Sequence, residues 1–196
     1  MRMFGMDGYQ LEKIELGCNF TIEINPGDII FITGPSGTGK TTILNEIYKR
    51  ILPAERIALS DIEIPNDKAV IDSLGLWFTE SLGYFTTAGL AGAKDLLNRP
   101  DRLSEGQQWR FRLASALASG KKYIFADEFC STLDRITASA LSYNIRKFAD
   151  RYKATFILAS AHQDILDDLR PDAIVERNFL NDTIITYKDS ERACHS

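Results

Sequence analysis

The chain has 196 residues, of which 44% are hydrophobic, so it can form one well-buried domain with, at most, a small inserted lobe. The formal net charge of −4 argues against a nucleic-acid coat protein, because such a protein needs a basic surface. No apolar run is long enough to span a bilayer, and Met1–Gly8 lacks the features of a signal peptide, so we expect a cytoplasmic location.

The cysteines are Cys18, Cys130 and Cys194, an odd number spread over the chain. This arrangement favours neither a disulfide framework nor a zinc site.

The N-terminal part of the sequence reads as strands. Residues Phe20–Ile24 alternate between apolar and polar, and Asn25–Asp28 is a turn signal, so we expect two antiparallel strands leading into the next motif. Upstream, Tyr9 could stack on an adenine ring or simply pack against the domain.

A complete phosphate loop of the form G-x-x-x-x-G-K-S/T follows the apolar run Ile29–Ile32 and precedes a helical pattern at Thr42–Tyr48. Glycines let successive backbone N–H groups turn toward a polyphosphate, and the following helix adds its positive dipole end. A Gly-rich turn beside a solvent lysine is the alternative. We expect the nucleotide to contact Gly34, Pro35, Ser36, Gly37, Thr38, Gly39, Lys40, Thr41 and Thr42.

Two side chains of this motif have expected chemical roles. Lys40 would reach the β- and γ-phosphates, and the hydroxyl of Thr41 would ligate Mg²⁺. Kinases, GTPases, helicases and transport ATPases all carry such a loop, so the loop alone does not give the function.

The middle of the chain changes character. Arg56–Ile64 reads as one strand or two short ones, and the pattern becomes helical from Val70, with a second helical run at Leu90–Leu97. We expect a single domain over 1–196, with an α/β core over 1–65 and 120–196 and a small helical lobe over 66–119.

The sequence Leu103-Ser104-Glu105-Gly106-Gln107 opens an amphipathic helix. Ser104 and Gln107 have capping-box spacing, so the free N–H groups of the helix should gather there and form a second anion site. A capped helix with no ligand is the alternative.

The apolar strand at Tyr123–Ala126 ends in the carboxylates of Asp127 and Glu128. In open α/β sheets, ligands bind at this end of the strands. Asp127 would hold Mg²⁺, directly or through water, and Glu128 could act as general base on the attacking water. A strand that ends in solvated acids is the alternative.

A long helical pattern follows Ser131–Asp134, and the buried strand at Ala154–Ala159 leads to His162. Although a lone histidine is usually structural, its position just beyond a core strand favours a functional role. A short helix at Ile165–Leu169 and a hairpin turning at Asn181-Asp182 are expected to close the chain.

Taken together and in this order, these motifs resemble the nucleotide-binding domain of the ABC ATPase superfamily over nearly the whole chain. The resemblance implies a P-loop NTPase fold of the α/β class: a mostly parallel sheet with flanking helices, an antiparallel β edge and an inserted helical lobe. It also implies ATP hydrolysis with Mg²⁺ in a head-to-tail homodimer, in which Ser104, Gly106 and Gln107 cap the ATP of the opposite protomer. Asp127 would be the magnesium acid and Glu128 the base. Asp134 would end the loop that crosses the dimer interface, and His162 would contact the γ-phosphate.

The sequence departs from the family at the magnesium-contacting glutamine that normally follows the second-lobe strand. No glutamine lies between Gln10 and Gln107, and Asn66 is the nearest match, so we expect Asn66 to be the metal ligand at this position. The helical lobe is also compact. Both features favour a soluble ABC ATPase with an unknown protein partner. The segment Asp127–Arg135 resembles a subgroup of soluble ABC ATPases that are sometimes fused to acetyltransferase-like domains. The ATP-binding subunit of a membrane transporter and a non-hydrolytic ATP sensor remain alternatives.

Overall fold

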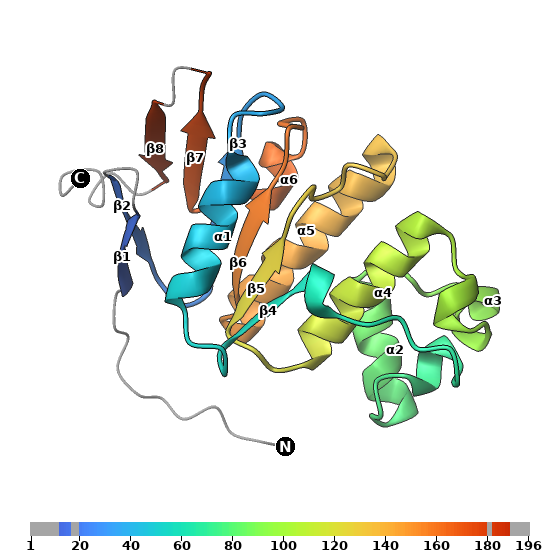
Figure 1. Ribbon diagram of the computed structural model, residues 1–196. Helices are drawn as coiled ribbons and strands as arrows, with labels where there is room; N and C mark the ends of the chain where they lie inside the picture. Colours follow the sequence, from blue (N-terminus) through green and yellow to red (C-terminus); the bar gives the residue numbers. More distant parts are fainter. Residues whose placement is uncertain (1–11, 17–19, 180–181, 189–196) are drawn as a thin grey trace.

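The computed structural model describes residues 12–16, 20–179 and 182–188. A six-stranded sheet runs through the molecule in the order β4-β5-β6-β3-β7-β8 (Figure 1). All neighbouring strands are parallel except β7 and β8, which form an antiparallel edge pair. The mostly parallel α/β sheet with an antiparallel edge is therefore confirmed. The strands are β3 (Ile29–Thr33), β4 (Arg56–Ala58), β5 (Tyr123–Ala126), β6 (Thr155–Ala159), β7 (Ala173–Arg177) and β8 (Thr183–Tyr187).

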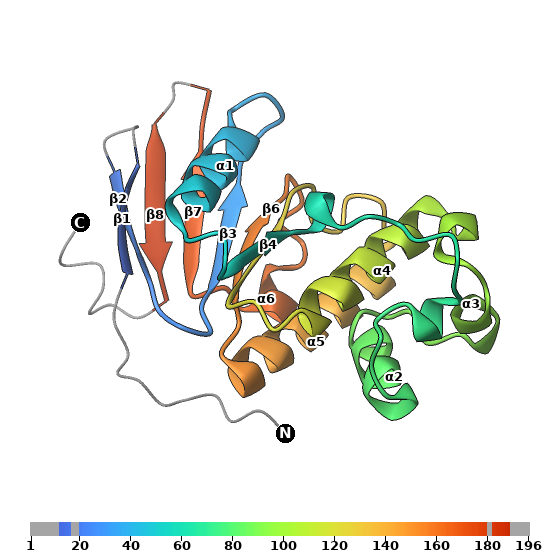
Figure 2. The same ribbon diagram turned by 60° about the horizontal axis from the view of Figure 1, so that its bottom comes forward.

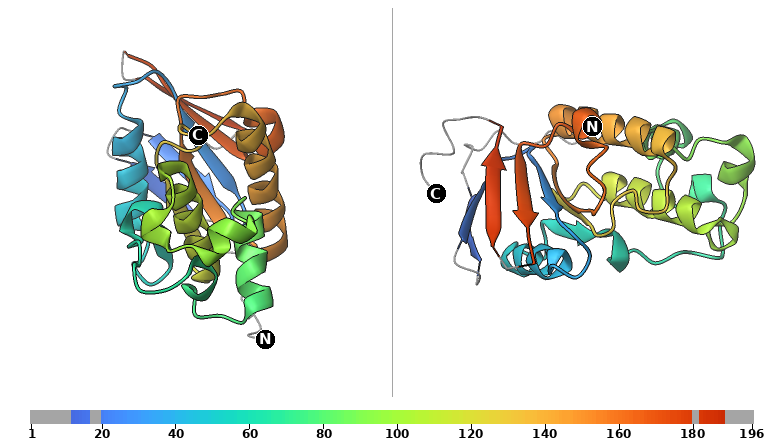
Figure 3. Two further views of the ribbon diagram at one scale, coloured as in Figure 1. Left: turned by 90° about the vertical axis from the view of Figure 1, so that its right-hand side faces the viewer. Right: turned by 90° about the horizontal axis from the view of Figure 1, so that it is seen from above.

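Helices cover both faces of the sheet, with α1 (Lys40–Arg50) on one face and α5 (Arg135–Tyr152) and α6 (Leu166–Leu169) on the other (Figure 3). Alternate residues of β3 pack into the hydrophobic clusters on the two faces of the sheet. Ile29 and Phe31 belong to the hydrophobic cluster that includes the buried residues of α5, whereas Ile30 and Ile32 belong to the cluster with α1. A strand buried on both faces needs a continuous apolar run, and this is why β3 lacks the alternation of a half-exposed strand.

The helical part of the chain lies beyond the edge strand β4 (Figure 2) and contains α2 (Phe78–Thr87), α3 (Ala93–Leu97) and α4 (Glu105–Ala118). Phe85 of α2 stacks on Phe111 of α4 with ring centroids 6.0 Å apart. Both rings belong to the same buried cluster as Ile29 and Phe31. This hydrophobic core is therefore continuous between the helical region and the sheet, and the division at residues 66 and 119 stays a prediction.

Two details of this region differ from the sequence prediction. The segment 56–64 forms strand only at β4 and then turns into a short 3-10 helix, η1 (Leu59–Asp61). The helix expected from residue 70 is only a 3-10 turn, η2 (Val70–Asp72), because Gly75 takes φ +66° and interrupts it before α2. A further turn, η3 (Pro100–Arg102), precedes α4.

The strands near the N-terminus also pair differently from the prediction. Across the expected turn, β2 (Phe20–Ile24) pairs with β1 (Glu12–Leu16) in a separate antiparallel sheet, whereas β3 pairs with β6 and β7. Burial on both faces explains this, since β3 fills a central position in the parallel sheet. The small sheet joins the rest through the backbone N–H of Glu23, which donates to the hydroxyl of Tyr187 at 3.0 Å. The C-terminal hairpin of β7 and β8 is confirmed.

Tyr9, Cys18 and Cys194 lie outside the described residues. Within the described ranges, no helix is both long and apolar enough to span a membrane, and no cluster of three or more His, Cys, Asp or Glu side chains could hold a metal by itself.

Candidate nucleotide site

The phosphate loop connects β3 to α1 and is shaped by its glycines. Gly34 has φ +140°, and a Cβ added there would lie 2.1 Å from the carbonyl oxygen of Arg177, so only glycine fits. Gly39 has φ +88° and is the N-cap residue of α1. Thr38 is buried, and its hydroxyl donates to the carbonyl of Pro35 at 2.9 Å, which closes the turn. The predicted strand-loop-helix context of the motif is present.

The polar groups of the loop converge on its interior. The ammonium of Lys40 donates to the carbonyl oxygens of Gly34 and Pro35, both at 2.9 Å, so its charge is held inside the curve of the loop. Ser36 and Gly37 are exposed at its crest, and Thr42 is exposed on the first turn of α1. A loop that combines a fixed ammonium with a helix N-terminus is suited to bind a polyphosphate.

A candidate magnesium site lies where α1 meets the end of β5. The hydroxyl of Thr41 donates to a carboxylate oxygen of Asp127 at 2.7 Å, although the two residues are 86 positions apart in the sequence. A hydroxyl and a carboxylate are hard oxygen ligands of the kind that Mg²⁺ prefers, so these residues fit the metal. Asn66 is exposed, and within the described chain its side chain makes no hydrogen bond with either residue.

Glu128 is exposed next to Asp127, and its backbone N–H donates to the Asp127 carboxylate at 2.9 Å. Its φ of +50° is unusual for a residue other than glycine. Strained backbone of this kind concentrates at functional sites, because only surrounding structure can maintain it. No pattern in the sequence revealed this conformation.

The predicted capping box at the start of α4 is present. Ser104 accepts a hydrogen bond from the backbone N–H of Gln107 at 3.4 Å, and the Gln107 side chain accepts one from the Ser104 N–H at 3.0 Å. A Cβ added at Gly106 would lie 3.7 Å from the side chain of Leu133, so this helix start packs beside the loop that follows Glu128. Ser104 is exposed.

The loops after β5 and β6 are tied together. The N–H of Phe129 donates to the carbonyl of Ala159 at 2.8 Å, and the hydroxyl of Ser160 donates to the carbonyl of Phe129 at 3.0 Å. The same hydroxyl accepts from the N–H of His162 at 3.1 Å, which fixes the backbone beside the exposed imidazole. Sequence reasoning missed the role of Ser160, although a hydroxyl at the end of a buried strand two residues before His162 was a usable signal.

Asp134 caps α5. Its carboxylate accepts from the hydroxyl of Thr137 at 2.6 Å and from the N–H of Thr137 at 3.0 Å. These hydrogen bonds, that of the hydroxyl foremost, lower the pKa of the Asp134 carboxyl. In this chain the carboxylate therefore fixes the start of the helix that follows the candidate interface loop.

All these elements meet at one end of the sheet. Figure 1 shows the phosphate loop and the loops after β5 and β6 at the carboxyl ends of the strands, where parallel sheets bind ligands. The start of α4 lies at the side of this region, where Gly106 is next to Thr132 and Leu133 of the loop between β5 and α5. Among the described residues, no hydrogen bond joins Ser104 or Gln107 to the phosphate loop of the same chain.

Comparison with known proteins agrees with this geometry. The profile of the ABC transporter family matches residues 18–88. The lipoprotein-releasing system ATP-binding protein LolD of Leptospira interrogans is 32% identical over 176 residues, which cover 72% of this chain and 74% of that protein. The chain belongs to the ABC transporter ATP-binding family. The corresponding protein of Novosphingobium aromaticivorans is 27% identical over 217 residues and covers 89% of this ABC cassette and 91% of its own length.

Solved structures support the same fold. The dimeric structure of a bacterial ABC transporter cassette superposes with a TM-score of 0.66 at 19% identity, covering 86% of this ABC cassette and 91% of that chain. A post-hydrolysis dimer bound to ADP and Pi gives 0.66 at 19% identity, with 85% and 91% covered. By its membership of that family, the protein is an ABC-type ATPase that binds and hydrolyses ATP.

Proposed function

We propose that two copies of this cassette close head to tail around two ATP molecules, each with Mg²⁺, and that the resulting cycle of closing and opening drives a membrane transporter. The observation that carries the dimer is the position of the capped α4 start. It is exposed at the same end of the molecule as the phosphate loop and makes no hydrogen bond with that loop in its own described chain. A helix N-terminus with free N–H groups is an anion site that a second molecule can use.

Within one copy, the loop residues would bind the phosphates. Lys40 and the backbone N–H groups of the loop would stabilise the charge that develops on the transferred phosphoryl group. Thr41 and Asp127 would hold Mg²⁺, which supplies further charge stabilisation when bound, and Asn66 would be a further ligand. Tyr9 would provide an adenine platform.

Hydrolysis would transfer the terminal phosphoryl group to water. Glu128 would accept a proton from that water and orient it, and His162 would contact the γ-phosphate. The exposed carboxylate at the end of β5 and the fixed backbone at residue 162 support these roles.

The opposite copy would complete the site. The hydroxyl of Ser104 and the N–H groups near Gly106 would meet the γ-phosphate, and Gln107 would hold Ser104 in place through the capping box. The loop that ends at Asp134 packs beside Gly106 in the same chain, so both interface segments would move together.

The names of the relatives support a transporter partner. Besides LolD, an L-cystine transport system ATP-binding protein of Escherichia coli is 28% identical over 193 residues. A soluble partner at the cytoplasmic side is the second candidate, and the absence of the usual glutamine near Asn66 favours it. In either case the cassette would work from the cytoplasm, where ATP is available.

The test uses the Glu128→Gln variant, which should bind ATP without completing the cycle. Gel filtration with ATP and Mg²⁺ should show a dimer, and without nucleotide a monomer. A variant that stays monomeric while wild-type protein hydrolyses ATP would contradict the dimer. Cross-linking of the trapped variant in cells separates the partners: an integral membrane protein supports the transporter, and an exclusively soluble one supports the second candidate.

A further inference from the structure

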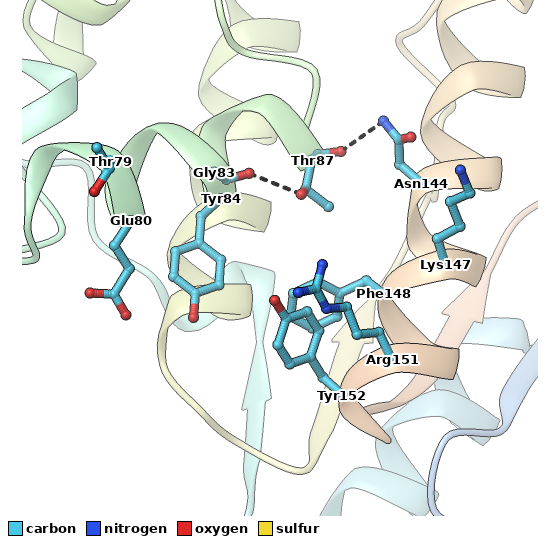
Figure 4. A pocket seen from close by; sticks show the side chains of 10 residues that line it. All are labelled: Thr79, Glu80, Gly83, Tyr84, Thr87, Asn144, Lys147, Phe148, Arg151 and Tyr152. Carbon is cyan, nitrogen blue, oxygen red and sulfur yellow. Dashed lines mark hydrogen bonds between the residues drawn. The ribbon is translucent and has the colours of Figure 1, made fainter. Parts of the chain in front are cut away.

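A pocket of about 550 Å³ lies between α2 and α5 (Figure 4). Its walls are residues 79–87 of α2 and residues 144–152 of α5. None of its lining residues belongs to the candidate nucleotide site, and Asn66 is not among them. The pocket is therefore formed by residues other than those expected to bind the nucleotide.

The floor of the pocket is aromatic. The rings of Tyr84 and Phe148 lie 6.4 Å apart, and those of Phe148 and Tyr152 lie 4.4 Å apart. Phe148 is buried, whereas Tyr152 is 43% exposed and offers part of its ring to the solvent side. Figure 4 shows Tyr84 extending from α2 and Tyr152 from α5 toward the same space. Such a surface favours a flat ring, because aromatic side chains stack on planar groups.

The α5 wall carries uncompensated positive charge. The guanidinium carbon of Arg151 lies 5.3 Å from the centre of the Tyr152 ring, and the ammonium of Lys147 lies 4.5 Å from the centre of the Tyr143 ring. Within the described part of the chain, neither cation forms an ion pair. The neighbouring carboxylate of Asp150 is taken by Arg146 at 2.7 Å. An anion at this wall would therefore meet two cations without carboxylate partners, although the ammonium of Lys147 lies over Tyr143, which is not a lining residue.

The opposite wall contains an acid and a phenol. Glu80 lines the pocket from α2. Burial foremost, and then the charge of Glu80, raise the pKa of Tyr84, so its hydroxyl stays a hydrogen-bond donor at neutral pH. The charges of the pocket are thus divided: α5 attracts an anion, and α2 disfavours one.

Gly83 keeps the α2 wall low. It occupies the middle of the helix, where glycine is less favourable than alanine, and a Cβ added there would meet no atom within 4 Å. Nothing in the described chain fills this space. A larger residue at this position would project into the pocket from a helix that has no steric need for glycine.

We propose that this pocket is a second ligand site, which takes a small molecule with a flat ring and one anionic group. The ring would lie against Tyr84 and the exposed part of Tyr152, and the anionic group would lie against Lys147 and Arg151, whose guanidinium rests on the Tyr152 ring. Three separate observations apply to the same cavity. It has an aromatic floor, its cations have no ion-pair partner, and the α2 side is open at Gly83.

The test uses fluorescence titration of the full chain, with saturating ADP and Mg²⁺ present so that the nucleotide site is occupied. The probes are anilinonaphthalene sulfonate, a flat ring system with one anionic group, and phenylnaphthylamine, its uncharged counterpart. Replacing both Arg151 and Lys147 by glutamine should weaken binding of the sulfonate by about tenfold or more, as expected for loss of a charge-assisted contact, and that of the amine by less than about twofold.

Gly83→Leu should abolish the binding of both probes without loss of thermal stability or ATP turnover. Lys68→Gln removes an exposed cation outside the pocket and should change neither affinity. Unchanged sulfonate binding by the folded Gly83→Leu protein would overturn the proposal, as would a double glutamine variant that loses both probes equally or neither.

Discussion

The hydroxyl of Thr41 donates a 2.7 Å hydrogen bond to the carboxylate of Asp127. This contact joins the first turn of α1 to the end of β5 and brings together the two protein oxygens that the sequence assigned to Mg²⁺. The two expected metal ligands therefore already lie side by side within one chain.

We expect Thr41→Val to lower the affinity for ATP with Mg²⁺ by at least about tenfold, since valine has a similar shape but no ligand oxygen. ATP affinity in the presence of a chelator should change little. Thr41→Ser keeps the hydroxyl and serves as the control. Calorimetric titrations with and without Mg²⁺ measure both affinities; equal losses under the two conditions would show that Thr41 does not act through the metal.

Glu128→Gln should reduce ATP turnover by roughly 10²–10⁴-fold, as expected for loss of a general base. Nucleotide affinity should be retained, because the amide has the same size. Phosphate release and gel filtration report turnover and dimer formation. Glu63→Gln makes the same substitution at an exposed carboxylate outside the site and should keep wild-type turnover.

Ser104→Arg should prevent ATP-dependent dimerisation while nucleotide binding by the monomer continues, because a bulky cation would occupy the space of the opposite phosphate. The substitution also removes the capping hydrogen bond, which costs about 1 kcal/mol of stability. Ser104→Ala loses the same cap without added bulk and is the matched control in gel filtration. A dimer formed by Ser104→Arg at wild-type ATP concentrations would rule out the trans contact.

We expect the buried thiol of Cys130 to make the stability of the folded protein depend on pH. Burial raises the pKa of its thiol to about 12, whereas an unfolded thiol titrates at about 8.5. The folded state therefore keeps its proton while the unfolded state loses it, and stability should fall as the pH rises above about 8.5. Between pH 8.5 and 10 the free energy of unfolding should fall by about 1–2 kcal/mol on account of this thiol.

Urea unfolding of wild type and Cys130→Ala at both pH values isolates this effect, since other titrating groups are common to the two proteins. The wild-type protein should lose more stability. Equal losses would mean that the thiol is not shielded from water in the folded protein.

Two glycines should respond in opposite ways to alanine. Gly34→Ala places a Cβ against the Arg177 carbonyl and should distort the loop, so that ATP binding is lost. Gly83→Ala has open space and should stabilise α2 by about 0.5–1 kcal/mol. Thermal unfolding and nucleotide titration of both variants check this contrast; a destabilised Gly83→Ala protein would contradict the open wall.

Much of the fold could be predicted because its core strands are buried on both faces. The apolar runs of β3, β5 and β6 are easily recognised because polar residues follow each of them. The capping box could also be predicted, because both of its hydrogen bonds join Ser104 to Gln107, only three residues away. Strand order could not be predicted, since the neighbours of β3 are set by packing between distant segments.

The helical region was harder to predict for a different reason. Apolar residues from Val70 to Phe78 suggested one continuous helix, but Trp77 is 84% exposed and Gly75 breaks the conformation. The hydroxyl of Ser160 at the end of a buried strand was a usable signal, but its partner Phe129 lies on a different loop and could not be predicted. The left-handed backbone of Glu128 has no signature in the sequence. Roles that need a second copy remain predictions.

The hydroxyl of Ser160 carries a consequence for signalling within one protomer. It donates to the carbonyl of Phe129, next to Glu128, and accepts from the N–H of His162. The two segments therefore cannot move apart without breaking one of these hydrogen bonds. We therefore expect that a displacement of the His162 imidazole on loss of the terminal phosphate also displaces the loop beside Gly106, which contains Thr132 and Leu133. In the proposed dimer, cleavage of the terminal phosphate would thus be communicated to the neighbouring protomer through Ser160, a buried side chain.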